Sequence, residues 1–252
     1  MNDDEVTPSF ATRGGQAQST RVLALNEFAL GAIKIGRRDP TTEGWLIQYV
    51  SFIINRGDRV GVLGPSGAGK TVLLRALALL DPLDAGAIIY QGEVVVGDEV
   101  PGYRSQVIYL HQKPALQEGT VEDNLRHPFT LKAHRQRQFD RRKATDLLAL
   151  LGRDAAFLGK SSRDLSGGEA QIAALVRAIQ LEPTILLLDE PTASLDPATA
   201  EAVEALLDRW MAARVDERAL VWVGHDREQT LRMTTRTISL TTGRLESESS
   251  DG

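Results

Sequence analysis

One short glycine-rich segment constrains the fold of this 252-residue chain more than any other feature. It lies between an apolar run at 59–63 and a stretch of helical period at 70–80, and consists of Gly64, Pro65, Ser66, Gly67, Ala68, Gly69, Lys70 and Thr71. Glycines let the backbone curl so that several N–H groups face one anion, and the following helix adds its N-terminal donors. In this pattern the lysine reaches the β- and γ-phosphates of a nucleotide, and the hydroxyl contacts Mg²⁺. The whole segment is therefore predicted to bind nucleotide phosphates, and Thr71 is also predicted to bind the Mg²⁺ ion. The alternative is a plain glycine turn.

Short apolar runs alternate along the chain with longer stretches of helical period. Strands are predicted at 59–63, 106–110, 184–188 and 219–223, and stretches of helical period lie at 70–80, 122–151, 168–180 and 197–214. Such runs suit a parallel sheet covered on both faces, and the alternation indicates an α/β fold. Antiparallel β-structure is predicted at 22–56 and 86–100, and a helical insert with two or three helices and no strand at about 115–165. The predicted fold class is an α/β P-loop NTPase core with a mainly parallel sheet, an antiparallel β subdomain and a helical subdomain.

Both ends of the chain are polar. We expect residues 1–20 and 243–252 to form disordered tails, so that one domain extends over 21–242.

Composition excludes several classes of function. The chain has 29 Lys+Arg, 34 Asp+Glu and no Cys, which excludes disulfides, thiolate catalysis and Cys-ligated metals. A net charge of −5 disfavours a dedicated nucleic-acid-binding domain, so no nucleic-acid partner is expected. No apolar run approaches the roughly 18–20 residues that cross a bilayer, so we expect no membrane span.

Two carboxylates follow the apolar run at 184–188. Asp189 and Glu190 would lie at the carboxyl edge of a parallel sheet, where ligands bind in such folds. Asp189 is placed to hold Mg²⁺, as the acidic partner of a phosphate loop does. Glu190 is the candidate catalytic residue that polarises an attacking water. The alternative for both is a solvated strand end.

Three further sequence features are informative because of their order along the chain. LSGGE at 165–169 opens a helix, with Ser166 as a plausible N-cap. Gln112 follows the strand at 106–110, and His225 follows the strand at 219–223. Taken alone, the first is an ordinary helix start, and a lone histidine beside a strand is usually structural.

With the loop at 64–71 and ILLLDE at 185–190, these elements resemble those of the ATP-binding cassette (ABC) family, the ATPases that power ABC transporters. The resemblance covers about residues 22–242. Gln112 resembles the family's Q-loop, LSGGE its signature motif, 194–196 its D-loop, and His225 its switch histidine.

The resemblance implies a mechanism that requires two copies of the chain. ATP and Mg²⁺ would be the ligands, and the ATP-bound domains would form a head-to-tail homodimer. Ser166, Gly167 and Gly168 would contact the γ-phosphate held by the other copy, with Glu169 also assigned to the nucleotide site. Gln112 would coordinate Mg²⁺ or the lytic water, and His225 would contact the γ-phosphate and support Glu190 in catalysis.

The family pattern is not matched everywhere. The aromatic residue that usually stacks on adenine would fall near residues 40–42, which are not aromatic, and Trp45 is a weaker substitute. After the signature, Ala170, Gln171 and Ile172 stand where the family commonly continues with an arginine.

The resemblance also implies a location and a task. The chain would lie peripherally at the cytoplasmic face of the inner membrane, bound to a separate transmembrane permease. Residues 103–129 look most like iron-export ATPases, and phosphate-type and amino-acid-type importers are also similar. A non-transport ABC ATPase acting on nucleic acid or ribosomes is the remaining alternative, although the chain has no sustained heptads. The basic run at 132–143 is either a solvated helix face or a docking segment for the membrane subunit or lipid headgroups.

Overall fold

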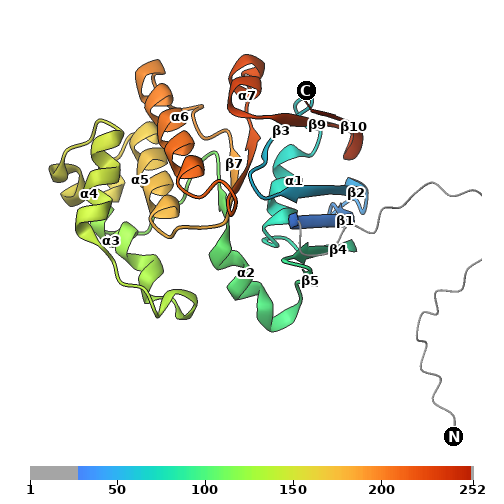
Figure 1. Ribbon diagram of the computed structural model, residues 1–252, viewed down its shortest axis with the longest axis horizontal. Coiled ribbons are helices and arrows are strands. Elements are labelled where there is room, and N and C mark those ends of the chain that lie inside the picture. The colour runs from blue at the N-terminus through green and yellow to red at the C-terminus, as the bar shows by residue number, and fades with distance from the viewer. Residues whose placement is uncertain (1–27, 251–252) are drawn as a thin grey trace, which may run out of the picture.

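The computed structural model of the protein describes residues 28–250 (Figure 1). The predicted N-terminal tail at 1–20 lies outside the described residues. No helix within the described part is both long and apolar enough to span a bilayer.

A six-stranded sheet forms the centre of the fold, in the order β10-β9-β3-β8-β7-β6. All neighbouring strands in it are parallel except β9 and β10. Its strands are β3 (Arg59–Leu63), β6 (Val107–Leu110), β7 (Ile185–Asp189), β8 (Ala219–Val223), β9 (Arg236–Thr241) and β10 (Arg244–Ser250). The four predicted core strands are thus confirmed, each shifted by one residue at most.

Strand β7 shows why these runs are apolar throughout. Ile185 and Leu187 pack into one hydrophobic core, whereas Leu186 and Leu188 pack into a second core on the other face. Side chains alternate across a strand, so burial on both faces requires an apolar residue at every position.

A second, four-stranded antiparallel sheet has the order β2-β1-β4-β5. Its strands are β1 (Phe28–Arg38), β2 (Trp45–Asn55), β4 (Ala85–Tyr90) and β5 (Glu93–Val94). The predicted antiparallel subdomain is confirmed, but its second part ends earlier than expected. Residues Gly97–Glu99 form a 3-10 turn, and α2 (Val100–Gln106) follows with a proline in its first turn, a position where the missing N–H costs nothing.

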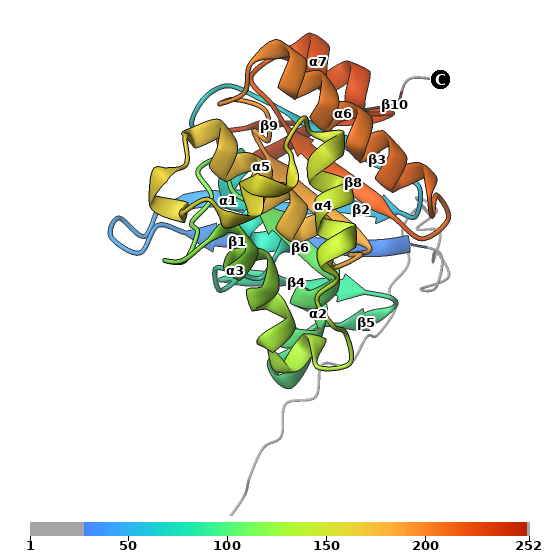
Figure 2. The ribbon, with the colours of Figure 1, turned by 90° about the vertical axis from the view of Figure 1, so that its left-hand side faces the viewer.

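Helices cover both faces of the central sheet. They are α1 (Lys70–Leu77), α3 (Val121–Arg126), α4 (Arg141–Leu150), α5 (Gly167–Ile179), α6 (Pro197–Ala212) and α7 (Arg227–Met233). The first core surrounds α1, between the antiparallel sheet and one face of the central sheet, whereas α5 and α6 pack on the other face. Helices α3 and α4 lie at the opposite end of the molecule from β1, β2 and β4 (Figure 1), and in Figure 2 the end with α3 and α4 faces the viewer.

The stretch of helical period at 122–151 forms two separate α-helices, in agreement with the two or three helices predicted for the insert. Helix α3 ends at Arg126, and 3-10 turns follow over His127–Thr130 and Lys132–His134. Pro128 has no N–H for a continuing helix. Helix α4 then starts afresh, with the Asp140 carboxylate accepting from the Lys143 N–H at 3.0 Å.

The predicted disordered tail at 243–252 is also wrong for most of its length. Residues 244–250 form β10, which pairs antiparallel with β9 after a tight turn at Gly243, whose φ is +75°. Polar residues suit a strand at the edge of a sheet, because one side of its backbone and its outer face meet water. Glu248 on this strand also forms an ion pair with Arg236.

Candidate functional site

The glycine-rich loop passes unusually close to neighbouring backbone. Gly64 has a φ of +147°, and a Cβ atom there would lie 2.1 Å from the carbonyl oxygen of Leu240. At Gly69, with a φ of +97°, a Cβ atom would lie 2.8 Å from the carbonyl oxygen of Leu46. Both positions therefore require glycine on steric grounds as well as for the turn.

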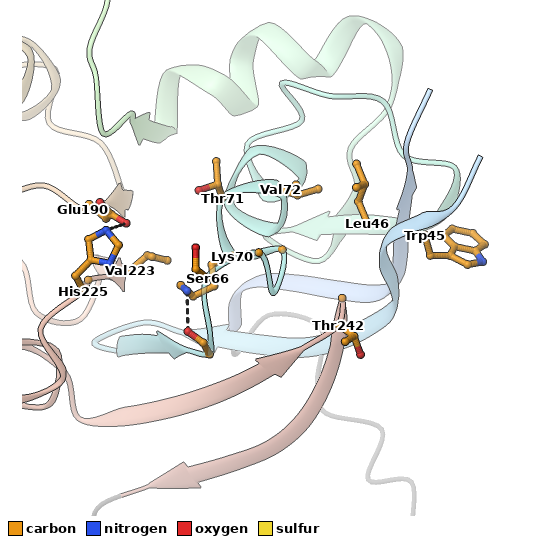
Figure 3. Close-up of a pocket in the computed structure, with 15 residues that line it drawn as sticks. Trp45, Leu46, Ser66, Lys70, Thr71, Val72, Glu190, Val223, His225 and Thr242 are labelled. Carbon is orange, nitrogen blue, oxygen red and sulfur yellow. Dashed lines mark hydrogen bonds and ion pairs between the residues drawn. The ribbon is translucent and has the colours of Figure 1, made fainter. Parts of the chain in front are cut away.

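Helix α1 starts directly from this loop. Gly69 is its N-cap and has no side chain to satisfy the first backbone donors, so these N–H groups and the positive end of the helix dipole face the loop. The Lys70 ammonium donates to the carbonyl oxygen of Gly64 at 2.7 Å (Figure 3) and to that of Pro65 at 3.0 Å. The loop is thus a concave cradle with a cation and several backbone donors.

A cavity of about 710 Å³ opens beside the loop. Glu190 and His225 lie at one end of it and Trp45 at the other, with loop residues between them (Figure 3). The residues that line it are Trp45, Leu46, Gly64, Ser66, Gly67, Gly69, Lys70, Thr71, Val72, Glu190, Val223, Gly224, His225, Thr242 and Gly243.

Glu190 and His225 form a pair at the edge of the central sheet. The Nε2 atom of His225 lies 2.6 Å from Oε1 of Glu190, and the Nε2 atom of Gln112 donates to its other oxygen, Oε2. The side chain of Glu190 is 11% exposed and that of His225 is 71% exposed, so the carboxylate is enclosed and the imidazole faces the open cavity. The structure therefore brings together three predicted site residues that are far apart in sequence.

Glu190 also has a rare backbone conformation. Its φ is +51°, in the left-handed region that non-glycine residues rarely adopt, and such strain costs roughly 1–3 kcal/mol. Its N–H donates to the carbonyl oxygen of Val223 at 2.8 Å, which ties the strained residue to the end of β8, two residues before His225.

Asp189, the last residue of β7, is only 2% exposed. Its Oδ2 atom accepts a hydrogen bond from the Tyr109 hydroxyl at 2.9 Å. Burial raises the pKa of Tyr109, and the adjacent Asp189 carboxylate raises it further, so the phenol stays protonated and donates. Neither Asp189 nor Gln112 is among the residues that line the cavity.

The donors in this region fit Mg²⁺ chemically. Thr71 offers a hydroxyl, Asp189 a carboxylate and Gln112 an amide oxygen that its bond to Glu190 does not use. Mg²⁺ prefers hard oxygen ligands and is usually held by one or two carboxylates together with substrate phosphates.

The signature residues lie away from this cavity. Ser166 caps α5 by accepting from the Glu169 N–H at 3.2 Å, and Glu169 accepts in return from the Ser166 N–H at 2.9 Å. Both oxygens of Glu169 also lie 2.8 Å from the Lys160 ammonium, and this contact is the main reason why the pKa of Glu169 is lowered. Ser166 and Gly167 are exposed at the helix start, so the site as predicted consists of two separate surfaces within one chain.

Trp45 lines the cavity although it belongs to β2. The guanidinium of Arg38 lies 4.3 Å from its ring centroid, and the Tyr49 ring lies 5.4 Å away. The sequence left the role of Trp45 open between core residue and ring platform, and the structure places it at the cavity rim.

Sequence reasoning missed part of the cavity wall. Thr242 and Gly243 line it from the turn between β9 and β10, in a region that was expected to begin a disordered tail. The polar composition contains no signal for this, because the turn reaches the site only when β10 pairs with β9. Tyr109 was likewise seen only as part of a strand.

Comparisons with known proteins find a family model and curated relatives. A sequence model of the ABC transporter family matches residues 47–193. The sulfate/thiosulfate import ATP-binding protein CysA of Bordetella pertussis is 39% identical over 206 residues, which cover 79% of this chain and 56% of CysA. The probable iron export ATP-binding protein FetA of Escherichia coli is 35% identical over 184 residues, which cover 73% of this chain and 80% of FetA. This chain thus matches only about half the length of some curated relatives.

Solved structures share the fold. The dimeric post-hydrolysis structure of the ATP-binding cassette MJ0796, bound to ADP and Pi, superposes with a TM-score of 0.79 and 26% identity. The superposition covers 88% of this chain and 99% of that one.

Proposed function

Because this chain belongs to the ABC transporter family, we propose that it is the ATP-binding and ATP-hydrolysing subunit of a transporter whose membrane-spanning subunit is a separate chain. The observation that supports this most directly is that the loop at 64–71, Glu190 and His225 line one cavity. A cradle of backbone donors suits nucleotide phosphates, and an enclosed carboxylate beside it suits activation of a water.

The residues divide the work by their chemistry. The backbone of residues 64–69 and the ammonium of Lys70 hold the phosphates, which requires Lys70 to exchange its bonds to Gly64 and Pro65 for bonds to phosphate oxygens. Thr71, Asp189 and Gln112 hold Mg²⁺, which when bound neutralises phosphate charge. Glu190 accepts the proton of the attacking water, and His225 orients Glu190 through the 2.6 Å contact. Trp45 provides a ring at the far end of the cavity for the base.

A second copy of the chain completes the site. Ser166 and Gly167 are exposed at the start of α5, Gly168 follows them in its first turn, and none of the three lines the cavity of its own chain. The positive end of this helix gains most when an anion meets it, so the γ-phosphate bound to the partner is its ligand. Glu169 belongs to the same surface and fixes the helix start through its bonds with Ser166. The dimeric state of the similar cassette MJ0796 supports this arrangement.

The cargo belongs to the same proposal. We infer metal export as the first candidate, because residues 103–129 resemble iron-export ATPases and FetA, whose name states probable iron export, is 35% identical over 80% of its length. The alternative is an importer of the phosphate or amino-acid type. It is supported by the phosphate import ATP-binding protein PstB 2 of Natronomonas pharaonis, 33% identical over 95% of this chain and 84% of that protein, and sulfate import enters through CysA. In either case the chain works at the cytoplasmic face of the membrane, bound to its permease. Co-purification with any membrane protein encoded beside it, followed by transport assays in vesicles with Fe²⁺, with phosphate and with sulfate, separates these candidates.

The test of hydrolysis replaces the Glu190 carboxylate with an amide of nearly the same shape. Glu190→Gln is expected to abolish Mg²⁺-dependent ATP turnover while it retains ATP binding, and to elute as a dimer with ATP on a sizing column. Glu201→Gln, an exposed position on α6, is the matched control and should behave like the wild type. A wild-type chain that binds no ATP, or a Glu190→Gln variant that hydrolyses at the wild-type rate, would overturn the proposal.

A further inference from the structure

The hydroxyl of Tyr109 on β6 contacts Asp189, the last residue of the neighbouring strand β7. Strands β6 and β7 are parallel, and Tyr109 pairs with Leu187, so both side chains lie on one face of the sheet. Asp189 follows two residues later on that same face. The Tyr109 hydroxyl donates to Oδ2 of Asp189 at 2.9 Å.

We propose that Tyr109 is a positioning residue for Mg²⁺, which holds Oδ2 of Asp189 so that Oδ1 serves the metal. This inference rests on the proposed function, in which Asp189 is the carboxylate that meets the ion. Tyr109 acts through Asp189 and contacts neither the phosphates nor the water.

The burial of Asp189 makes this one bond important. The residue is 2% exposed, and a buried carboxylate needs donors to hold its charge. Among the described residues, Tyr109 makes the one side-chain hydrogen bond to Asp189, and no lysine or arginine forms an ion pair with it. Without the phenol, the carboxylate can rotate about its last torsion, and the oxygen presented to the metal is no longer fixed.

The Tyr109 ring is itself held in place. It lies edge-on to the His111 ring, with centroids 5.8 Å apart and an interplanar angle of 85°. Tyr109 also packs against the first hydrophobic core. The hydroxyl is therefore a rigid donor, and hydrogen bonds to metal-ligating groups of this kind typically change metal affinity about 10–100-fold when removed.

The variant Tyr109→Phe keeps the ring and removes the donor. Its affinity for the non-hydrolysable analogue AMP-PNP would be measured by calorimetry with excess Mg²⁺ and with excess EDTA. We expect affinity in EDTA to equal that of the wild type, and the gain from Mg²⁺ to fall about tenfold. The Mg²⁺ concentration that half-saturates the nucleotide-bound protein should rise by the same factor.

The matched control is Tyr90→Phe, since the Tyr90 hydroxyl lies 2.8 Å from Oγ1 of Thr184 and is also partly buried. This variant should keep the wild-type gain from Mg²⁺. The inference would be overturned if Mg²⁺ increased the AMP-PNP affinity of Tyr109→Phe as much as that of the wild type. It would also be overturned if the variant lost AMP-PNP affinity equally in Mg²⁺ and in EDTA. If the wild type itself binds AMP-PNP no better with Mg²⁺ than without, the proposed function fails instead.

Discussion

Gly168 and Ser194 approach each other so closely that a Cβ atom on Gly168 would lie 2.8 Å from the carbonyl oxygen of Ser194. Gly168 is in the first turn of α5, and Ser194 lies in the segment between β7 and α6. The exposed start of α5 is therefore packed against the loop that follows Glu190. The second signature glycine is needed for contact within its own chain, apart from any contact with a nucleotide.

This contact predicts opposite outcomes for two adjacent glycines. Gly168→Ala should lower the free energy of unfolding by about 1–3 kcal/mol, because the opposing atom is backbone and cannot move aside cheaply. Gly167→Ala should leave it unchanged or raise it by up to about 1 kcal/mol, since its added Cβ would lie 3.8 Å from the Ser194 side chain. Urea denaturation measures both, and equal effects at the two positions would contradict the packing argument.

A polar chain links the loop after Glu190 to two helices. The Thr192 hydroxyl donates to Gln229 of α7 at 3.0 Å, and Gln229 donates to the Glu204 carboxylate of α6 at 2.7 Å. Gln229→Leu should cost about 1–3 kcal/mol, because Thr192 and Glu204 lose partners in a part-buried setting. ATP turnover should fall as well, since Thr192 is two residues beyond Glu190. The control is Arg227→Ala on the same helix, an exposed change expected to stay within about 0.5 kcal/mol. Equal losses of stability in Gln229→Leu and Arg227→Ala would contradict a stabilising role for this polar chain.

Arg236 joins the two sheets through its guanidinium. It donates to Oδ2 of Asp58 at 2.7 and 3.1 Å and also contacts the carbonyl oxygen of Ile53 and the carboxylate of Glu248. Arg236→Met should cost about 3 kcal/mol, because it leaves the Asp58 carboxylate enclosed without a cation. Arg214→Met removes a pair with Glu217 that is more than half exposed and should cost under about 1 kcal/mol. Thermal unfolding of the two variants measures the loss of stability. A loss of stability in Arg236→Met no larger than that in Arg214→Met would contradict the prediction.

The ion pair at the end of α1 predicts a pH dependence. Arg75 donates twice to Asp81, each time at 2.7 Å, and this hydrogen bonding is the main cause that lowers the pKa of Asp81 below 3.8. Since the folded pKa is the lower one, the stabilisation is complete above pH 3.8 and disappears as the pH falls through the folded value. Asp81→Asn should therefore reduce the free energy of unfolding by the same amount at pH 7 and pH 5, and by less below pH 4.

A double-mutant cycle checks the assignment. In an Arg75→Gln background, Asp81→Asn should have a smaller effect at pH 7, and that effect should no longer vary with pH. Guanidinium denaturation at each pH provides the measurement. A loss at Asp81 that persists unchanged below pH 4, or that is indifferent to Arg75, would show that another contact is responsible.

Much of the fold could be predicted because strong local patterns encode it. The strands at 59–63 and 184–188 are buried on both faces, so their apolar runs are unbroken. A glycine-rich loop of this pattern between a strand and a helix is typical of phosphate binding. The stretch of helical period at 122–151 is divided into two helices because Pro128 interrupts it after α3. The tail at 243–252 was wrong because β10 exists through its pairing with β9, and an edge strand can be polar.

The sequence by itself determined the kinds of group at the site: a phosphate cradle at 64–71, two carboxylates at a strand end, a glutamine and a histidine. These follow from short segments whose chemistry depends on neighbouring residues. Only the tertiary structure decided which groups touch. It placed His225 and Gln112 on the two oxygens of Glu190, Tyr109 on Asp189, and Gly168 against Ser194. The physical reason is that strand order and helix packing set these distances, and both depend on burial of two cores formed by residues far apart in the chain.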